Sequence, residues 1–229
     1  MSHSQISPAI LYFGTPVAII SSSNEDGTSN LAAISSVWWL GHRCMLGFGA
    51  GKTPQNIFRT KQCVINLPDD TMTPHVNRLA VTTGDDPVSE AKKSRNYQFV
   101  KDKWTWAKLT PEASELVAPT RVKECPVQME CELAMVHPMM QDLYGGQAGL
   151  LYALEMRVCR IYVRDDLRMS GFANRIDPDK WRPLIMSFQE FYGLRDKKVD
   201  GSELGKVNEE KYRAFADIDD EKTAAKFRE

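Results

Sequence analysis

The chain has 229 residues and a net formal charge of −1, from 29 lysines and arginines against 30 aspartates and glutamates. Hydrophobic residues make up 42 % and charged residues 26 %, which is ordinary globular usage and excludes a disordered or fibrous chain. Because the charges balance, no general electrostatic attraction to nucleic acid or to an anionic membrane is expected. Any ligand must therefore be recognised at a local site.

The cysteines and the N-terminus restrict the class of protein further. Five cysteines without a C-x-x-C pair argue against a disulfide framework and against a zinc site, and Cys125 and Cys131 are expected to be buried thiols. Residues 1–8 lack the basic-then-apolar order of a signal peptide. The apolar stretches are also much shorter than the roughly 20 residues that span a bilayer. We therefore expect a cytoplasmic protein without a metal site.

The first seventy residues are expected to be mainly strands, because their apolar runs are rich in β-branched and aromatic residues. The expected strands are residues 17–20, 31–40, 44–48 and 63–67. Residues 24–27 predict a hairpin turn, with Gly27 at the position that needs a positive φ. Thr53 followed by Pro54 predicts the cap and first position of a short helix.

The rest of the chain is expected to hold few helices. Thr73 and Pro74 predict a second capped helix that ends near Gly84, and a third is expected at residues 177–181. Residues 85–120 are expected to run over the surface. Two long strands are expected at residues 127–136 and 150–163, with Gly145 and Gly146 in the loop between them.

Strands therefore dominate and the turns are short, which favours a closed β-barrel over an alternating βαβ sheet. We assign residues 1–195 to one domain. Residues 196–229 are assigned to a charged peripheral tail, which is expected to be partly helical from Glu209.

A run of alternating glycines predicts an anion site. Gly47, Gly49 and Gly51 follow a strand and lead to Lys52 and Thr53 at a helix start. Exposed backbone N–H groups, a helix N-terminus and a lysine together suit a phosphate. A nucleoside-triphosphate P-loop would need glycine at position 46, where leucine stands. The alternative is that the glycines only serve a tight crossover of the barrel.

The strand before this run contains small side chains at positions where bulky ones are usual. Ala32, Ala33, Ser35 and Ser36 would let a flat ligand lie against the backbone. A slot for a planar ring beside a phosphate site suggests flavin mononucleotide (FMN).

Several motifs, in this order and spacing, resemble those of the flavin reductase-like family of FMN-binding split barrels. They are Thr-Pro-Val-Ala-Ile-Ile-Ser-Ser at 15–22, Asp-Gly-Thr-Ser-Asn-Leu-Ala at 26–32, Gly-Lys-Thr-Pro-Gln-Asn-Ile-Phe-Arg-Thr at 51–60, Val-Ile-Asn-Leu at 64–67, Leu-Thr-Pro at 109–111, Val-Ala-Pro-Thr-Arg-Val at 117–122, Glu-Cys-Pro-Val-Gln-Met-Glu at 124–130 and Asp-Pro-Asp-Lys-Trp-Arg-Pro-Leu-Ile at 177–185. The resemblance covers residues 10–195.

The resemblance implies a six-stranded Greek-key split barrel that forms a homodimer, with FMN near the subunit interface. It implies that Ala33, Ile34, Ser35 and Ser36 face the isoalloxazine and ribityl chain, and that Gly49, Ala50, Lys52 and Thr53 hold the phosphate. The implied activity is an oxidoreductase in which NADH or NADPH transfers a hydride to FMN, with a partner monooxygenase as one possible electron acceptor. No catalytic side chain is expected, because the cofactor carries the chemistry.

Two other functions stay open: an FMN-binding electron carrier or flavin sensor, and an FMN-dependent enzyme acting on an organic substrate. For the second, Tyr97, Trp104 and Trp106 either wall a pocket or anchor residues 85–120. Trp38 and Trp39 are expected to pack in the core or at a dimer contact rather than against the flavin. The remaining candidates are His42, His75 and His137, expected to be structural, and Phe188, Phe191 and Tyr192, expected to cover apolar surface or to form a lid.

Overall fold

The computed structural model describes residues 1–144, 150–194, 199, 202 and 206–209. The predicted loop at Gly145 and Gly146 and the predicted helix from Glu209 fall largely outside these residues. The division at residue 195 stays a prediction. No helix among the described residues is both long and apolar enough to cross a membrane.

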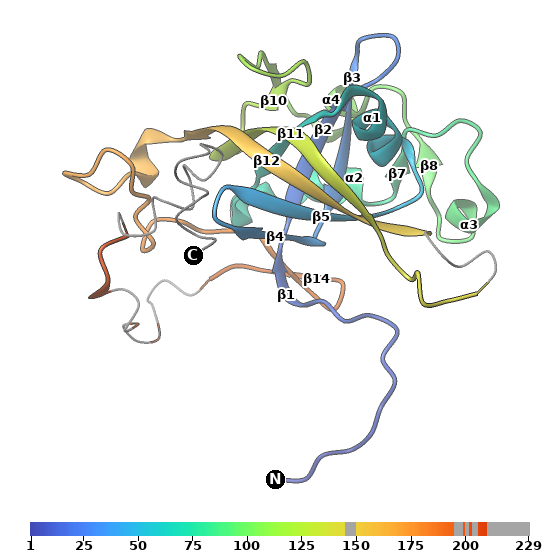
Figure 1. Ribbon diagram of the computed structural model, residues 1–229, viewed down its shortest axis with the longest axis horizontal. Coiled ribbons are helices and arrows are strands. Elements are labelled where there is room, and N and C mark those ends of the chain that lie inside the picture. Colours follow the sequence, from blue (N-terminus) through green and yellow to red (C-terminus); the bar gives the residue numbers. More distant parts are fainter. Residues whose placement is uncertain (145–149, 195–198, 200–201, 203–205, 210–229) are drawn as a thin grey trace, which may run out of the picture.

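A strongly curved antiparallel sheet of seven strands forms the body of the protein, in the order β3-β2-β6-β11-β12-β5-β4 (Figure 1). The mainly β architecture of a split barrel is therefore confirmed. The strands are β2 (Ala18–Ser23), β3 (Ser29–Ile34), β4 (Val37–Leu40), β5 (Arg43–Gly49), β6 (Gln62–Leu67), β11 (Val127–Pro138) and β12 (Leu151–Val163). The predicted turn before β3 is also present, with Gly27 at φ 80°.

The predicted single strand at residues 31–40 is wrong, because this run forms two strands at opposite edges of the sheet. β3 pairs with β2, whereas β4 pairs with β5. The chain crosses between the two edges at Ser35 and Ser36. There the Gly47 amide donates to the Ser36 carbonyl at 2.8 Å, so the crossover is bonded to the middle of β5.

Two apolar clusters cover the two faces of the sheet. Ile20, Leu46 and Met156 belong to the cluster enclosed by the sheet. Ile19 and Leu31 belong to the cluster under the helices α2 (Thr73–Ala80) and α4 (Lys103–Ala107). Ile19 and Ile20 are both fully buried although they are neighbours, because successive side chains of a strand point to opposite faces.

The helices begin differently from the predictions. In α1 (Lys52–Thr60) the N-cap is Gly51, and no side chain caps the helix, so the predicted Thr53 cap is wrong. The Thr53 hydroxyl instead accepts a hydrogen bond from the Asn30 amide at 3.0 Å. In α2 (Thr73–Ala80) Thr73 is likewise the first helical residue, and the helix ends before Gly84.

The third predicted helix, at residues 177–181, is also wrong. The Lys180 and Trp181 amides both bond to the Asp177 carbonyl, which makes a single turn. The following residues form β13 (Ile185–Ser187) and β14 (Glu190–Tyr192). With β1 (Phe13–Pro16) they make a three-stranded sheet in the order β1-β13-β14, which the sequence did not predict. The rings of Phe13 and Phe188 make an edge-on contact there, with their centroids 4.7 Å apart.

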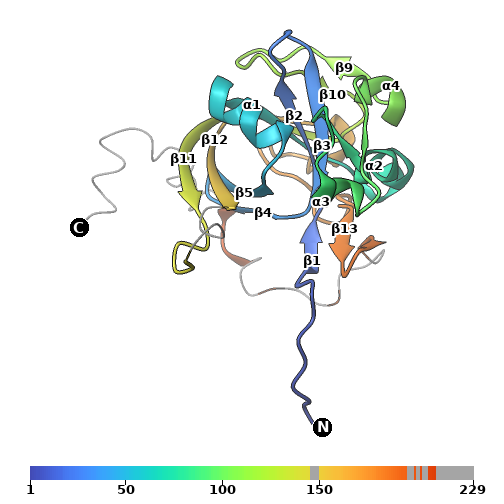
Figure 2. The same cartoon turned by 90° about the vertical axis from the view of Figure 1, so that its right-hand side faces the viewer.

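Residues 85–120 pack beside α2 and β3 (Figure 2). Two tryptophans attach this segment: Trp104 Nε1 donates to the Ser29 carbonyl at 2.9 Å, and Trp106 Nε1 donates to the Arg78 carbonyl at 2.8 Å. Both are therefore anchors. The segment and its partners comprise β7 (Thr82–Thr83), α3 (Glu90–Lys93), β8 (Gln98–Phe99), α4 (Lys103–Ala107), β9 (Pro111–Glu112) and β10 (Arg121–Val122). Asp70–Met72 and Asp165–Leu167 each form a single 3₁₀ turn.

The prediction that Cys125 and Cys131 are buried thiols is confirmed. Cys125 and Cys131 are buried, as are Cys44 and Cys63, while Cys159 is exposed. Burial raises the pKa of the Cys125 and Cys131 thiols, so both are neutral, small apolar side chains.

The crossover generates a prediction at Gly47. A Cβ atom there would lie 2.7 Å from Ser36 Cβ, so Gly47→Ala should lower the free energy of unfolding by about 1–3 kcal/mol through overpacking. Gly49→Ala is the matched control, since its Cβ would meet Leu151 Cδ2 at an ordinary 3.7 Å. Urea unfolding of both variants tests this, and equal stabilities would contradict it.

Candidate functional site

A cleft lies where β3, the junction between β5 and α1, and the end of α2 meet. Six of the eight residues predicted to bind a cofactor line it: Ala33, Ile34, Gly49, Ala50, Lys52 and Thr53. They come from segments separated in the sequence, so it is the fold that brings the two predicted groups together. Thr82, Thr83 and Gly84, which follow α2, form another part of the wall.

The other two predicted residues lie outside the cleft lining. Ser35 is buried at the crossover, and the Ser36 hydroxyl lies 2.7 Å from the Tyr12 hydroxyl. Their contact with a ligand stays a prediction. Trp38 and Trp39 do not line the cleft either: Trp38 is exposed and Trp39 packs against the cluster enclosed by the sheet.

The end of the cleft along β3 is lined by small and apolar residues. Ala32 and Ala33 of β3 have side chains no larger than a methyl group, and Phe48, Leu79 and Tyr97 add larger apolar side chains to the lining. A planar ring can approach a strand backbone closely at such alanines. Tyr97 comes from the 85–120 segment, so of its three aromatic candidates this is the one that walls the cleft.

The other end of the cleft, at the start of α1, has the features of an anion site. Gly49, Ala50 and Gly51 lead directly into α1, whose first turn has no side-chain cap. The Lys52 and Thr53 amides are among the first N–H groups of the helix, which have no partner within it. The positive end of the helix dipole adds to these donors, so a phosphate or carboxylate is favoured there.

Three lysines line the cleft, each with a different partner. Lys52 Nζ lies 2.8 Å from Glu25 Oε2. Lys92 Nζ pairs with the Asp85 carboxylate. Lys103 Nζ donates to the Leu31 carbonyl at 2.8 Å.

Two glycines leave room for the side chains of Lys92 and Lys52. A Cβ atom on Gly51 would lie 3.1 Å from Lys92 Nζ. A Cβ atom on Gly84 would lie 3.2 Å from Lys52 Cβ. Larger residues at these two positions would therefore push on the side chains that surround the helix N-terminus.

Lys103 is the most unusual of the three, because only 3 % of it is exposed. Burial lowers its pKa to about 8; the charge of Lys92 acts in the same direction and the carboxylate of Asp85 opposes it. A bound anion would favour the charged ammonium. The sequence analysis missed Lys92 and Lys103, since both lie in the segment assigned to the surface and no motif marks them.

A buried polar network fixes α1 against the strands. Asn56 is fully buried, and its side-chain amide donates to the Ser22 hydroxyl at 3.2 Å and to Asn24 Oδ1 at 2.9 Å. With the bond between Asn30 and Thr53, these contacts set the distance between the helix N-terminus and β3. The anion end and the apolar end of the cleft are thus rigidly connected.

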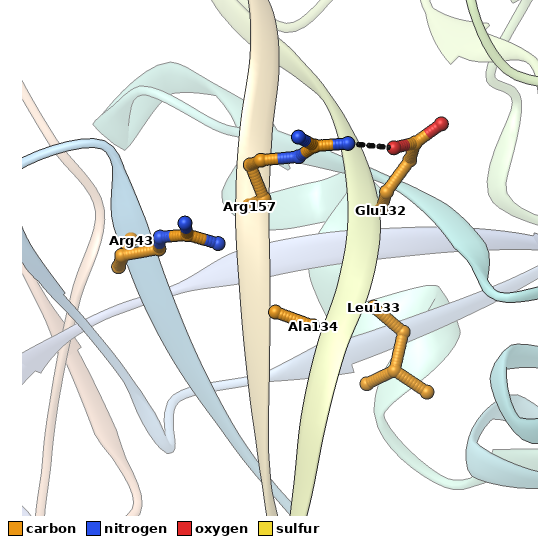
Figure 3. Close-up of a pocket in the computed structure, with 5 residues that line it drawn as sticks. All are labelled: Arg43, Glu132, Leu133, Ala134 and Arg157. Carbon is orange, nitrogen blue, oxygen red and sulfur yellow. Dashed lines mark hydrogen bonds and ion pairs between the residues drawn. The ribbon is translucent and has the colours of Figure 1, made fainter. Parts of the chain in front are cut away.

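A second, shallower groove lies on β5, β11 and β12 (Figure 3). It contains Arg43 and Arg157, and Arg157 forms an ion pair with Glu132 at 2.5 Å. It has no helix terminus and no alternating glycines, and none of the predicted site residues lines it. Within the described residues, no three histidine, cysteine or acidic side chains are grouped as a metal site would need.

The histidines make ordinary contacts. His75 Nδ1 lies 2.8 Å from the Ala107 carbonyl, and His137 Nε2 lies 3.4 Å from Glu155 Oε2.

The buried lysine generates a prediction about stability. Below pH 8 Lys103 is charged in both states and its burial opposes folding. Between pH 8 and the ordinary lysine pKa of 10.5 the unfolded chain holds a proton that the folded chain does not, so stability rises with pH. Relative to Lys103→Met, the wild-type protein should gain about 2 kcal/mol between pH 7.5 and pH 9.5. Urea unfolding of both proteins at these pH values measures the gain, and a pH-independent difference would contradict it.

Comparison with known proteins supplies the context of the cleft. A protein of Bacillus subtilis (strain 168) described as uncharacterized protein YdfE is 35 % identical over 205 residues, which cover 89 % of this chain and 92 % of that protein. Flavoredoxin of Desulfovibrio vulgaris (Miyazaki F) is similar in structure, with a TM-score of 0.69 at 17 % identity over 90 % of this chain and all of that one.

Nitrilotriacetate monooxygenase component B from Bacillus cereus has a TM-score of 0.66 at 21 % identity, over 86 % of this chain and 98 % of that one. At such identities the two structural likenesses establish the fold. The family model described as flavin reductase like domain matches residues 10–194. These residues include every segment that forms the cleft, and the chain is thus a member of the flavin reductase-like domain family.

Proposed function

We propose that the cleft binds FMN, with the isoalloxazine ring against Ala32 and Ala33 and the phosphate at the N-terminus of α1. One observation carries this proposal: the uncapped N-terminus of α1, three lysines and the small residues of β3 all line the same cleft. Both parts of an FMN molecule are thereby matched by residues that line one continuous cleft. Membership of the flavin reductase-like family supports the choice of a flavin.

We further propose that the protein is an NAD(P)H-dependent flavin reductase. Bound FMN would accept a hydride from NADH or NADPH and pass electrons to a second acceptor. The chain itself holds the phosphate through backbone amides and lysines, orients the ring on β3, and shields one side of it with Phe48 and Tyr97. Such positioning needs no acid or base from a side chain.

A homodimer, a cytoplasmic location and a partner monooxygenase are part of the same proposal. The similarity in structure to a protein described as a monooxygenase component supports a partner of that kind. Exposed Phe13, Trp38 and Leu40 are apolar residues of β1 and β4 that a second subunit would cover.

The visible spectrum of the purified protein under anaerobic conditions tests the activity. FMN is added first, then NADH or NADPH in separate samples. Bleaching of the flavin band by either nucleotide is the expected result, and it names the donor. A bound flavin band that persists with both would contradict the reductase and favour a carrier or another flavoenzyme. Failure to bind FMN would contradict the proposed cofactor.

Lys52→Ala tests the position of the phosphate. A charge-assisted hydrogen bond to phosphate contributes about 1.5–3 kcal/mol, so the affinity for FMN should fall about 10- to 100-fold. Riboflavin, which lacks the phosphate, should bind both proteins equally. Lys93→Ala is the control variant, because Lys93 is exposed and pairs with Glu90 away from the cleft. Unchanged FMN affinity in a fluorescence titration of Lys52→Ala would rule out this position.

A further inference from the structure

Two of the three lysines that line the cleft are paired with carboxylates of the chain itself. Glu25 lies in the hairpin between β2 and β3, and its side chain is 64 % exposed. The Glu25 carboxylate forms an ion pair with Lys52, which is the first residue of α1. Glu25 Oε1 also lies 3.9 Å from Nε of Arg59 in the last turn of that helix. Ion pairing with Lys52 lowers the pKa of Glu25, so its carboxylate is charged at neutral pH.

Asp85 makes the second pair. Its carboxylate binds Lys92 and accepts a hydrogen bond from the Thr83 hydroxyl at 3.1 Å. The side chains of Asp85 and Lys92 are only 24 % and 17 % exposed. A Cβ atom on Gly51 would lie 3.7 Å from Asp85 Oδ2, so this carboxylate stands beside the N-cap of α1.

Two carboxylates therefore offset part of the positive charge beside the start of α1. Glu25 pairs with Lys52, and Asp85 pairs with Lys92. A phosphate bound at the N-terminus of α1 would compete with Glu25 for Lys52 and with Asp85 for Lys92. Repulsion between each carboxylate and the phosphate reduces affinity for an anion without affecting a neutral ligand.

We propose that Glu25 and Asp85 act as internal competitors of the ligand's phosphate and so set how strongly the cleft prefers a phosphorylated flavin over riboflavin. This inference rests on the proposed FMN site. It assigns the two carboxylates a role in specificity.

A purely structural role for Glu25 makes a different prediction. If its contacts with Lys52 and Arg59 only hold the hairpin on α1, their loss should lower stability and leave the ratio of FMN to riboflavin affinity unchanged. Exposed ion pairs contribute little to stability, so Glu25→Gln should remain folded. The affinity ratio therefore separates the two roles.

The experiment compares the wild-type protein, Glu25→Gln and Asp85→Asn in fluorescence titrations with FMN and with riboflavin. Each variant should bind FMN about three- to tenfold more tightly than the wild type, with riboflavin affinity unchanged. FMN should also dissociate more slowly in a stopped-flow measurement. Glu90→Gln is the matched control, because Glu90 pairs at 2.7 Å with Lys93 on exposed α3, and Lys93 does not line the cleft, whereas Lys52 and Lys92 do.

Unchanged or weaker FMN binding by Glu25→Gln would overturn the inference, as would an equal gain for FMN and riboflavin. Thermal unfolding shows whether Asp85→Asn is folded, and Glu25→Gln decides the question if it is not. A wild-type protein that binds neither flavin would contradict the proposed function instead, so the two failures are distinguishable.

Discussion

The hydrogen bond from the Gly47 amide to the Ser36 carbonyl holds the chain where it crosses from one edge of the main sheet to the other. A side chain at position 47 would occupy the space of Ser36, so this approach requires glycine. β3 and β4 are thereby placed at opposite edges although two residues separate them. The small side chains of β3 then lie opposite the junction of β5 and α1, and the cleft exists because of this arrangement.

The cleft combines a connected frame with partly offset charges. Buried Asn56 and Asn30 connect α1 to the neighbouring strands and so fix the helix N-terminus relative to β3. The positive charges of Lys52 and Lys92 are offset in part by Glu25 and Asp85. In the proposed site, selectivity for an anionic ligand then depends on the competition between these carboxylates and the ligand for the lysines.

Local patterns predicted most of the strands, because β-branched runs act over short distances, and the alternating glycines before Lys52 predicted residues that line one cleft. Predictions failed where tertiary contacts decide. The run at 31–40 looks continuous, yet the bond from Gly47 divides it. Residues 177–181 carry a capping pattern, but Pro183 pairs with Asp69 and β13 pairs with β1, which ends the turn. Lys103 enters the cleft only through the anchoring of α4 by Trp104, which no local pattern could reveal.

The central claim is that one ligand spans the apolar and the anionic ends of this cleft, with its phosphate at α1. A crystal structure of the protein soaked with FMN tests it most directly. The account predicts phosphate oxygens within hydrogen-bond distance of the Lys52 and Thr53 amides and a ring lying along Ala32 and Ala33. A phosphate bound elsewhere, such as between Arg43 and Arg157, would contradict it.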